Sequence, residues 1–182
     1  MTARVVTGAC GQRCLSSAAM PINSEERKAL DQQMVEAAFV CDLLRVRTLL
    51  ARGADPNARD EEGRTPLFSA VLGGSVALLG LLLESKADVN ARDATGATAL
   101  HVAAEEVLFE AATLLVARGA DVNAQDEDGN TPLTRAVRSA RGRYDVVRLL
   151  LEAGAKDDIP NGAGETPRAL AERLGDDVFT TN

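Results

Sequence analysis

The side chain with the clearest potential for chemistry is the single histidine, His101. Histidine is the usual general base near neutral pH, and a carboxylate that orients its ring would complete a catalytic pair. Glu105 follows four residues later, but this is also the ordinary spacing of a salt bridge on one helix face. The sequence contains no G-x-S-x-G, Walker-type phosphate loop, HExxH or paired-cysteine motif. We therefore interpret His101 as structural and predict a protein that is not an enzyme.

The three cysteines are the other groups that could do chemistry. Cys10 and Cys14 could share a metal ion, but neither a second pair nor a nearby histidine completes a site around them. With Cys41 the number is odd, which disfavours a disulfide framework and favours a reducing compartment. We expect no cofactor and a cytoplasmic location, with the nucleus as the alternative.

Three consecutive stretches of the chain repeat one another at a fixed step. They are residues 64–96, 97–129 and, with two extra residues, 130–164. A period of this size indicates stacked supersecondary units that bury their apolar faces against one another. Threonine followed by proline is a helix start, and glycine after an apolar helix is a helix stop. The residues predicted to have such structural roles are Thr65, Pro66, His101, Gly119, Thr131 and Pro132.

The repeated motif resembles the ankyrin repeat. The signature T-P-L-H-x-A is matched by Thr98-Ala99-Leu100-His101 with Ala103, except that Ala99 replaces the proline, and the later segment G-A-D-x-N-A is matched by residues 119–124. The likeness covers the chain from about Met34 to the C-terminus. It implies an all-α solenoid of stacked helix-turn-helix units with projecting β-hairpin-like loops. It also implies that His101 bonds to a neighbouring repeat through its ring.

The repeat divides the chain into six segments. Asn23 and Glu26 have the spacing of a capping box, so a helix should begin there and run to Val40 as the cover of the stack. The array ends within a repeat at Asn182, and whether the chain is a complete protein or part of a larger one stays open. The expected segments are a flexible tail (1–22), a capping helix with a degenerate first repeat (23–63), repeats at 64–96, 97–129 and 130–164, and a truncated last repeat (165–182).

Three features depart from the regular pattern. Lys86 stands where other copies have a helix-stopping glycine, at a cost of roughly 1 kcal/mol. Leu108 and Phe109 put apolar side chains into an inter-helix turn, where we favour packing against the next repeat over a contact patch. The two extra residues lie around 139–143 and should lengthen the turn there.

The resemblance also implies where a partner would bind. In ankyrin arrays the hairpin tips and the exposed side of the inner helices form a concave groove that binds other proteins. At the matching positions of this chain the chemistry varies, whereas the framework repeats, as expected of a binding surface on a scaffold. The predicted protein-contact residues are Glu61, Glu62, Arg64, Leu72, Ala94, Thr95, Ala97, Glu105, Glu106, Glu127, Asp128, Asn130, Arg138, Ser139, Arg141 and Arg143.

Charge separates the remaining function classes. The net charge is −7, with acidic triplets at 60–62 and 126–128 and an arginine cluster from Arg135 to Arg143. A partner protein of complementary charge would be attracted, although acidic tips that only keep the stack soluble are an alternative. Nucleotide or nucleic-acid binding through Arg135–Arg143 is the second functional class, which the acidic balance and the lack of tryptophan disfavour. We expect a monomer that binds another protein and does not insert into membranes, because the longest apolar run is too short.

Overall fold

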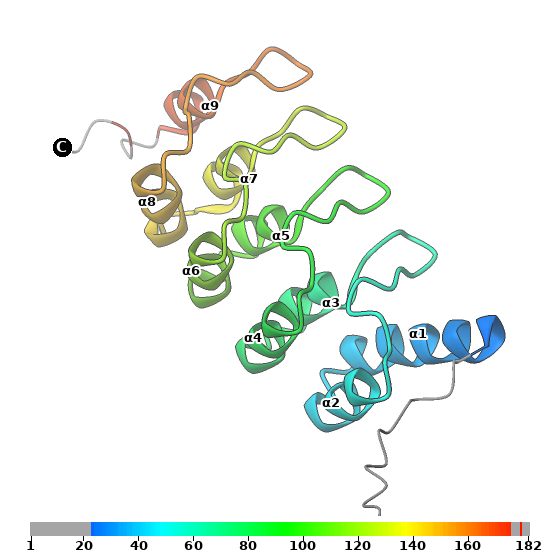
Figure 1. Ribbon diagram of the computed structural model, residues 1–182. Helices are drawn as coiled ribbons and strands as arrows, with labels where there is room; N and C mark the ends of the chain where they lie inside the picture. Colours follow the sequence, from blue (N-terminus) through cyan, green and yellow to red (C-terminus); the bar gives the residue numbers. More distant parts are fainter. Residues whose placement is uncertain (1–22, 176–178, 180–182) are drawn as a thin grey trace, which may run out of the picture.

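The computed structural model describes residues 23–175 and Phe179, so the predicted tail at 1–22, with Cys10 and Cys14, lies outside the described residues. Within the described part the chain folds into helices arranged in successive pairs, as Figure 1 shows. The helices are α1 (Ser24–Phe39), α2 (Leu43–Ala51), α3 (Pro66–Leu72), α4 (Val76–Glu84), α5 (Ala99–Glu105), α6 (Phe109–Ala117), α7 (Pro132–Ser139), α8 (Asp145–Glu152) and α9 (Pro167–Leu174).

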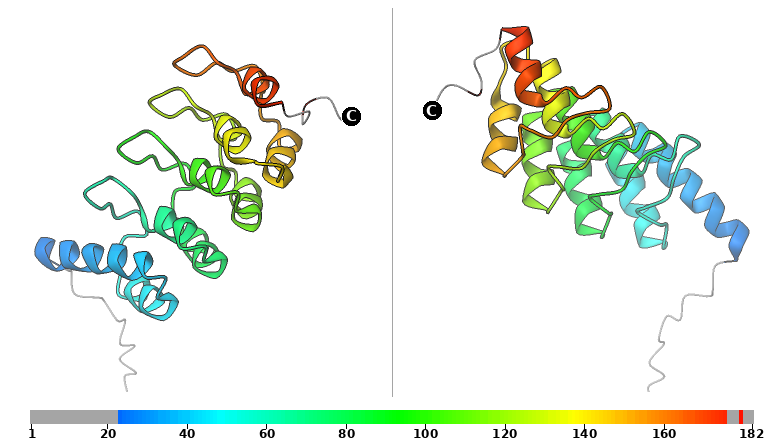
Figure 2. Two further views of the ribbon diagram at one scale, coloured as in Figure 1. Left: turned by 180° about the vertical axis from the view of Figure 1, so that it is seen from behind. Right: turned by 90° about the horizontal axis from the view of Figure 1, so that it is seen from above.

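The helices form two layers. The inner helices α1, α3, α5, α7 and α9 lie next to the long loops, and the outer helices α2, α4, α6 and α8 lie on the opposite side (Figures 1 and 2). Each long loop joins an outer helix to the next inner helix, and all of them project from the same side of the stack. The predicted all-α solenoid is therefore confirmed.

The first helix begins as its capping residues predict. The Asn23 side chain accepts a hydrogen bond from the N–H of Glu26 at 2.7 Å, and the Glu26 carboxylate accepts one from the N–H of Asn23 at 3.2 Å. Leu30 and Met34 are buried, whereas the remaining faces are largely exposed. One continuous helix thus covers the end of the stack and is also the inner helix of the first unit.

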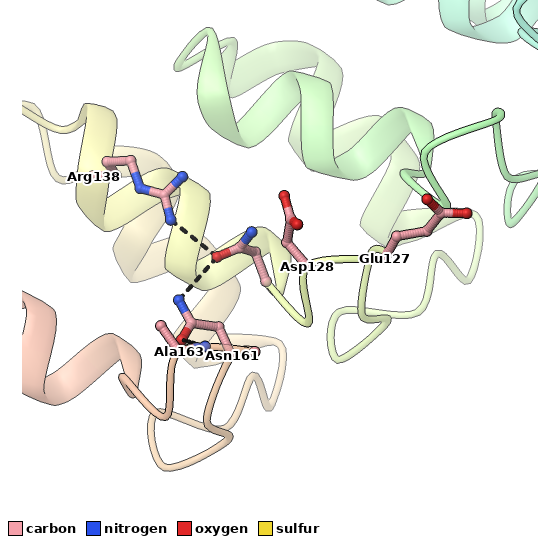
Figure 3. Close-up of a pocket in the computed structure, with 7 residues that line it drawn as sticks. Glu127, Asp128, Arg138, Asn161 and Ala163 are labelled. Atoms are coloured by element: carbon pink, nitrogen blue, oxygen red, sulfur yellow. Dashed lines mark hydrogen bonds between the residues drawn. The ribbon is translucent and has the colours of Figure 1, made fainter.

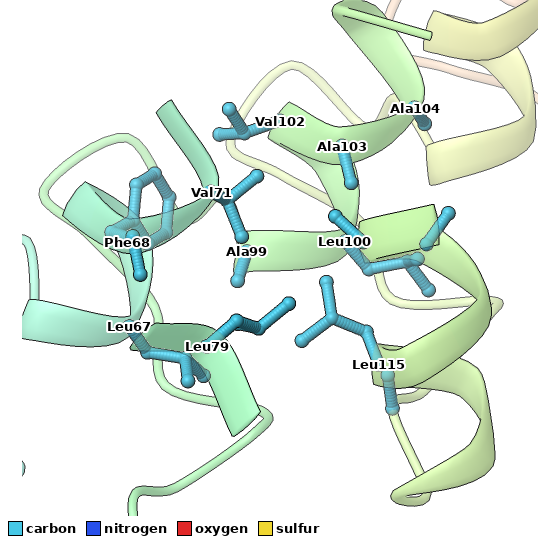
Figure 4. Close-up of a cluster of buried hydrophobic side chains, with 14 of the residues drawn as sticks. Leu67, Phe68, Val71, Leu79, Ala99, Leu100, Val102, Ala103, Ala104 and Leu115 are labelled. Carbon is cyan, nitrogen blue, oxygen red and sulfur yellow. The ribbon is translucent and has the colours of Figure 1, made fainter. Parts of the chain in front are cut away.

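The core runs along the stack between the two layers. Leu82, Leu115 and Leu150 occupy equivalent positions of three outer helices, and each is fully buried. They belong to one core cluster with inner-helix residues such as Leu67 and Leu100, and Figure 4 shows Leu115 beside Leu100 in the middle of the array. Burying a leucine side chain contributes about 1.5–3 kcal/mol. Because much of this burial is against adjacent units, the stability of each unit depends on its neighbours.

The loops are joined to one another by asparagine side chains that recur once in each unit. Asn57, Asn90 and Asn123 each accept a hydrogen bond from a backbone N–H of the following loop, at 2.7, 2.8 and 2.8 Å. Within the described residues the only β-type pairing is an isolated bridge between Arg92 and Thr98. The projecting segments are therefore turns held in register by side chains rather than regular hairpins.

The irregular positions have visible consequences. Lys86 takes a left-handed conformation, with φ 67°, as glycine does in the other units. The turn between α7 and α8 spans residues 140–144 and is longer than the turns at 73–75 and 106–108. Leu108 is half-buried against the core. Phe109 is 43% exposed and borders α8, so packing against the next unit holds only in part for this side chain.

The last unit is represented by α9 and the residues around it. Thr166 caps the helix by accepting from the N–H of Ala169 at 3.1 Å, and Gly175 ends it with φ 77°. The Arg168 guanidinium lies 5.5 Å from the ring centre of Phe179. The other residues after Gly175, the end of the predicted truncated repeat, lie outside the described part.

Candidate protein-binding surface

The loop tips are shaped by an aspartate that begins each turn. The Asp93 carboxylate accepts from the N–H groups of Thr95 and Ala97, at 2.9 and 3.0 Å. Asp60 accepts in the same way from the N–H groups of Glu62 and Arg64. The two residues after each such aspartate consequently point outward. The predicted tip residues that are exposed are Glu61, Glu62, Ala94, Thr95, Glu127 and Asp128.

Three other predicted tip residues are buried or half-buried. For them the prediction of an exposed contact residue is corrected. Ala97 is only 2% exposed and Asn130 only 5% exposed. Both lie where the loop returns to the stack, and the carbonyl of each accepts from the N–H of the aspartate that opens the turn. Arg64 is half-buried, and its guanidinium is held by Asp60 at 2.8 Å and Glu62 at 3.0 Å.

The charge of the third loop also differs from the sequence prediction. The Asp126 side chain is 2% exposed and accepts from Arg135 at 2.7 Å, so it is an internal group rather than a tip acid. Burial alone would raise the pKa of Asp126, but the hydrogen bonds from Arg135 and from the N–H of Asn130 outweigh it. The pKa therefore lies below its ordinary value of 3.8. The negative charge of this tip comes from Glu127 and Asp128.

A second set of exposed side chains lies at the C-terminal ends of the inner helices. We call Phe39, Leu72, Glu105 and Arg138 the inner-helix row, because they occupy the same position of α1, α3, α5 and α7, one repeat apart. All four are exposed. The sequence prediction included the last three and missed Phe39, although one repeat length counted back from Leu72 leads to it. Glu106 is exposed and Ser139 is half-buried, one residue after the row.

Three shallow hollows lie along the inner helices and the loops. One of about 490 Å³ is bordered by the loop residues Glu127 and Asp128, the following loop and Arg138, as Figure 3 shows. Arg138 is held there by a hydrogen bond to the Asn130 side chain at 2.9 Å. A second, of about 400 Å³, lies between Glu105 and Glu106 on one side and three arginines, at 138, 141 and 143, on the other.

The third hollow belongs to the N-terminal end of the array. It has a volume of about 230 Å³ and is bordered by Glu36 and Phe39 of α1 and by the loop tip at Glu61 and Glu62. Hollows therefore occur at both ends of the surface that the loops and inner helices share. Arg138 borders two of them, so the tip surface and the inner-helix row are continuous at that residue.

Comparison with protein-family models identifies the architecture. A model described as ankyrin repeats (3 copies) matches residues 34–126, and one described as ankyrin repeats (many copies) matches residues 109–151. The chain belongs to the ankyrin repeat family. The predicted recognition is therefore confirmed. A search of curated proteins found no match to the chain.

The histidine of the ankyrin signature lies inside the protein. His101 is fully buried, and its Nδ1 accepts from the N–H of Thr98 at 3.1 Å. Its Nε2 lies 3.0 Å from the carbonyl oxygen of Asn130 in the following loop. Burial lowers the pKa of His101 below 6.5, so the ring is neutral at pH 7. Both ring nitrogens are occupied by bonds within the ankyrin framework.

The arginine cluster is smaller at the surface than its sequence suggests. Arg135 is directed into the stack, where it donates to Asp126 and, at 2.8 Å, to Glu105. Arg138, Arg141 and Arg143 are exposed. The acidic side chains of Glu105 and Glu106 border the same hollow as these arginines. The cluster is therefore one half of a surface that carries both signs of charge.

Three further observations concern membrane spans, metal sites and disulfides among the described residues. No helix among them is long and apolar enough to cross a membrane. They also contain no group of three or more His, Cys, Asp or Glu side chains placed to hold a metal ion. Cys41 takes no part in a disulfide within the same residues.

Proposed function

We propose that the chain is a non-catalytic module that binds a partner protein through its loop tips and its inner-helix row. Ankyrin repeats generally mediate protein–protein interactions, and the family membership supports this coarse function directly. The observation that carries the proposal is a contrast between two sets of equivalent positions. Outer-helix positions repeat as Leu82, Leu115 and Leu150, whereas the inner-helix row has four different side chains.

The contrast follows from what each position must do. A core position has to fill the same space in every unit, so it takes the same residue type. An exposed position is free of that demand, and differences between units give each unit of the surface its own chemistry. The contact residues proposed on this basis are the exposed tips and the row. Ala97 and Asn130 belong instead to the structural framework, and the Arg64 side chain stabilises the loop tip on which it lies.

Three tip carboxylates test the proposal without disturbing the framework. Glu61, Glu127 and Asp128 are exposed, and their side chains make no hydrogen bond or ion pair to other described residues. Replacing all three by lysine should abolish capture of the partner from an extract of the source cells. The matched control replaces three exposed glutamates of the outer helices by lysine, which gives the same change of net charge: Glu84, Glu110 and Glu152.

The two triple variants give opposite outcomes if the proposal is right. The outer-helix control should capture the same protein as the unchanged chain, and the tip variant should not. If both variants capture the same proteins, the tips do not select a partner. We further propose that the chain acts as a monomer in the cytoplasm, with the nucleus as the alternative compartment.

The second functional class, nucleotide or nucleic-acid binding, is weakened by the side chains around the arginines. Arg135 is committed to Asp126 and Glu105, and the hollow beside Arg138 also contains the carboxylates of Glu105 and Glu106. Phosphate groups entering this hollow would meet negative charge on its other side. Salt-dependent retention on a nucleic-acid column that is lost when residues 138, 141 and 143 become alanine would restore this class.

A further inference from the structure

The inner-helix row changes character in one direction along the array. It begins with Phe39, which is 66% exposed, and Leu72, which is 49% exposed. It continues with the Glu105 side chain, which is also 50% exposed, and ends with Arg138. The four positions therefore present two apolar groups, then an acid, then a base. Because they are equivalent positions of adjacent units, this order is also their order in space.

Neighbouring residues extend each part of the row. The apolar end continues into the exposed side chains of Val40 and Val76, which are 66% and 41% exposed. These lie at the first two inter-helix turns, which pack closely. A Cβ added at Gly73 would collide with the sulfur of Cys41, so the two turns are in contact. The exposed apolar side chains of this end therefore belong to two units whose turns are in contact.

The charged end of the row is a hollow with opposite charges on its two sides. Glu105 and Glu106 border it from α5, and Arg138, Arg141 and Arg143 border it from α7 and the lengthened turn. Among the described residues, no ion pair joins the two sides. Glu105 pairs instead with Arg135, and Glu106 has no charged partner there. The charges of Glu106 and of the three arginines are therefore available to groups of a bound molecule.

The spacing of the row suits an extended polypeptide. Packed helices lie about 8–10 Å apart, and a segment in the extended polyproline II conformation advances about 3.1 Å per residue with three residues per turn. A partner segment lying along the row would therefore place roughly every third side chain opposite a row residue. Such a segment needs about ten residues to reach from α1 to α7.

We propose that this surface binds an extended segment of a partner protein whose side chains, at every third residue, are apolar, apolar, basic and acidic in the direction from α1 to α7. The proposal rests on the protein-binding function proposed above and specifies the chemistry of the partner. The basic group would face Glu105 and Glu106, and the acidic group would face the three arginines. The two apolar groups would cover Phe39 and Leu72.

Synthetic ten-residue peptides test the order of charges directly. One peptide has the order Leu-x-x-Leu-x-x-Lys-x-x-Asp, with serine and threonine as spacers, and a second exchanges only Lys and Asp. Both are also made in the reverse sequence direction, because the spatial order fixes no chain polarity. In one polarity, the matched order should bind about tenfold more tightly in fluorescence anisotropy at low salt, from two surface ion pairs gained and two repulsions avoided. The preference should shrink as salt screens the charges.

A charge exchange in the protein supplies the decisive control. Glu106→Arg combined with Arg138→Glu leaves composition and net charge unchanged. It leaves the Glu105 side of the hollow without net charge and the arginine side with one net positive charge, so the opposition of charges is removed. The double variant should therefore lose most of the preference for the peptide with Lys before Asp. Its fold is checked by circular dichroism and by its melting temperature. Equal binding of both peptide orders by the unchanged chain, or no binding of either, would overturn the proposed segment.

The apolar end has its own matched pair of variants. Leu72→Ser should weaken binding of the matched peptide about tenfold, because one apolar contact is lost. Leu174→Ser should have no effect, since Leu174 has nearly the same exposure, 47%, but lies on α9 outside the row. Equal effects of the two variants would contradict the proposed position of the segment. A partner captured through the loop tips would still support the protein-binding function, so the two proposals fail independently.

Discussion

The Nε2 atom of His101 lies 3.0 Å from the carbonyl oxygen of Asn130 and joins the inner helix α5 to the following loop. Its Nδ1 must accept, because its partner at 3.1 Å is the backbone N–H of Thr98. The proton of the neutral ring is therefore on Nε2, which donates to Asn130. Protonation of Nδ1 would remove the acceptor that Thr98 needs. The hydrogen bond from Thr98 thus depends on a neutral imidazole, whereas the bond to Asn130 does not.

This dependence predicts that stability falls on mild acidification. The pKa of His101 is lowered by burial below the ordinary 6.5 that it regains on unfolding. Between the two values the unfolded chain binds the additional proton, so the free energy of unfolding decreases as pH falls below 6.5. The melting temperature should accordingly be lower at pH 5.5 than at pH 7.5.

His101→Phe provides the control, because Phe68 fills the equivalent position of the preceding unit. At pH 7.5 the variant should be less stable by about 1–3 kcal/mol, since the buried N–H of Thr98 loses its partner and the Asn130 carbonyl keeps only the N–H of Asp126. The difference between its melting temperatures at pH 7.5 and pH 5.5 should be much smaller than that of the unchanged chain. If the full difference persists, other groups cause it.

The third loop contains the buried pair of Asp126 and Arg135. It should therefore lose more stability than the other loops when the aspartate that begins its turn is replaced. Asp126→Ala leaves the Arg135 guanidinium, which is 18% exposed, without its internal acceptor, at a cost of about 3 kcal/mol. Asp93→Ala removes the equivalent carboxylate, which bonds only to its own loop, and should cost about 1 kcal/mol. Chemical denaturation compares the two, and equal losses would show that the ion pair adds nothing.

The same pair predicts a second acid-sensitive range. Because the pKa of Asp126 lies below its ordinary 3.8, its contribution to stability is complete above 3.8 and is lost as pH falls through the lower, folded-state value. This range is separate from that of His101. Asp126→Asn should therefore flatten the loss of stability below pH 4 and leave the change between pH 7.5 and pH 5.5 as it is.

Two threonines in equivalent positions should respond differently to loss of their hydroxyl group. Thr131 caps α7 by accepting from the N–H of Thr134 at 3.2 Å, and Thr131→Val should cost about 1 kcal/mol. The Thr65 hydroxyl is buried and has no hydrogen-bond partner among the described residues. Thr65→Val should thus be neutral or stabilising, because it removes an unsatisfied polar group from the interior. The melting temperature should fall in Thr131→Val and should stay the same or rise in Thr65→Val.

The sequence was sufficient for the architecture because the architecture is local. The period of the repeat, the capping box at Asn23 and the glycine stops are all determined within a unit or between adjacent units. The direction of particular side chains was harder to predict. Asp126 and Glu127 are adjacent acids in the sequence, yet one is buried against Arg135 and the other is exposed, because the turn directs one side chain inward.

The candidate surface was predicted only in part for the same reason. Exposure of Ala97 and Asn130 depends on hydrogen bonds with an aspartate four residues earlier, which a count of motif positions does not reveal. Phe39 was missed because it lies on the long first helix, where the repeat motif is degenerate. The order of chemistry along the inner-helix row became visible only when this residue was placed beside Leu72, Glu105 and Arg138.

Lys86 offers a stabilising substitution at the end of α4. Its φ of 67° lies in the left-handed region, where a side chain costs about 1 kcal/mol relative to glycine. The Asn57 side chain donates a hydrogen bond to the backbone carbonyl of Lys86, so this contact does not need the lysine side chain. Lys86→Gly should therefore raise the free energy of unfolding by up to about 1 kcal/mol. Gly119→Ala, at the equivalent position with φ 85°, should lower it by a similar amount. Denaturation midpoints that move in the same direction for both variants would show that backbone strain does not govern this position.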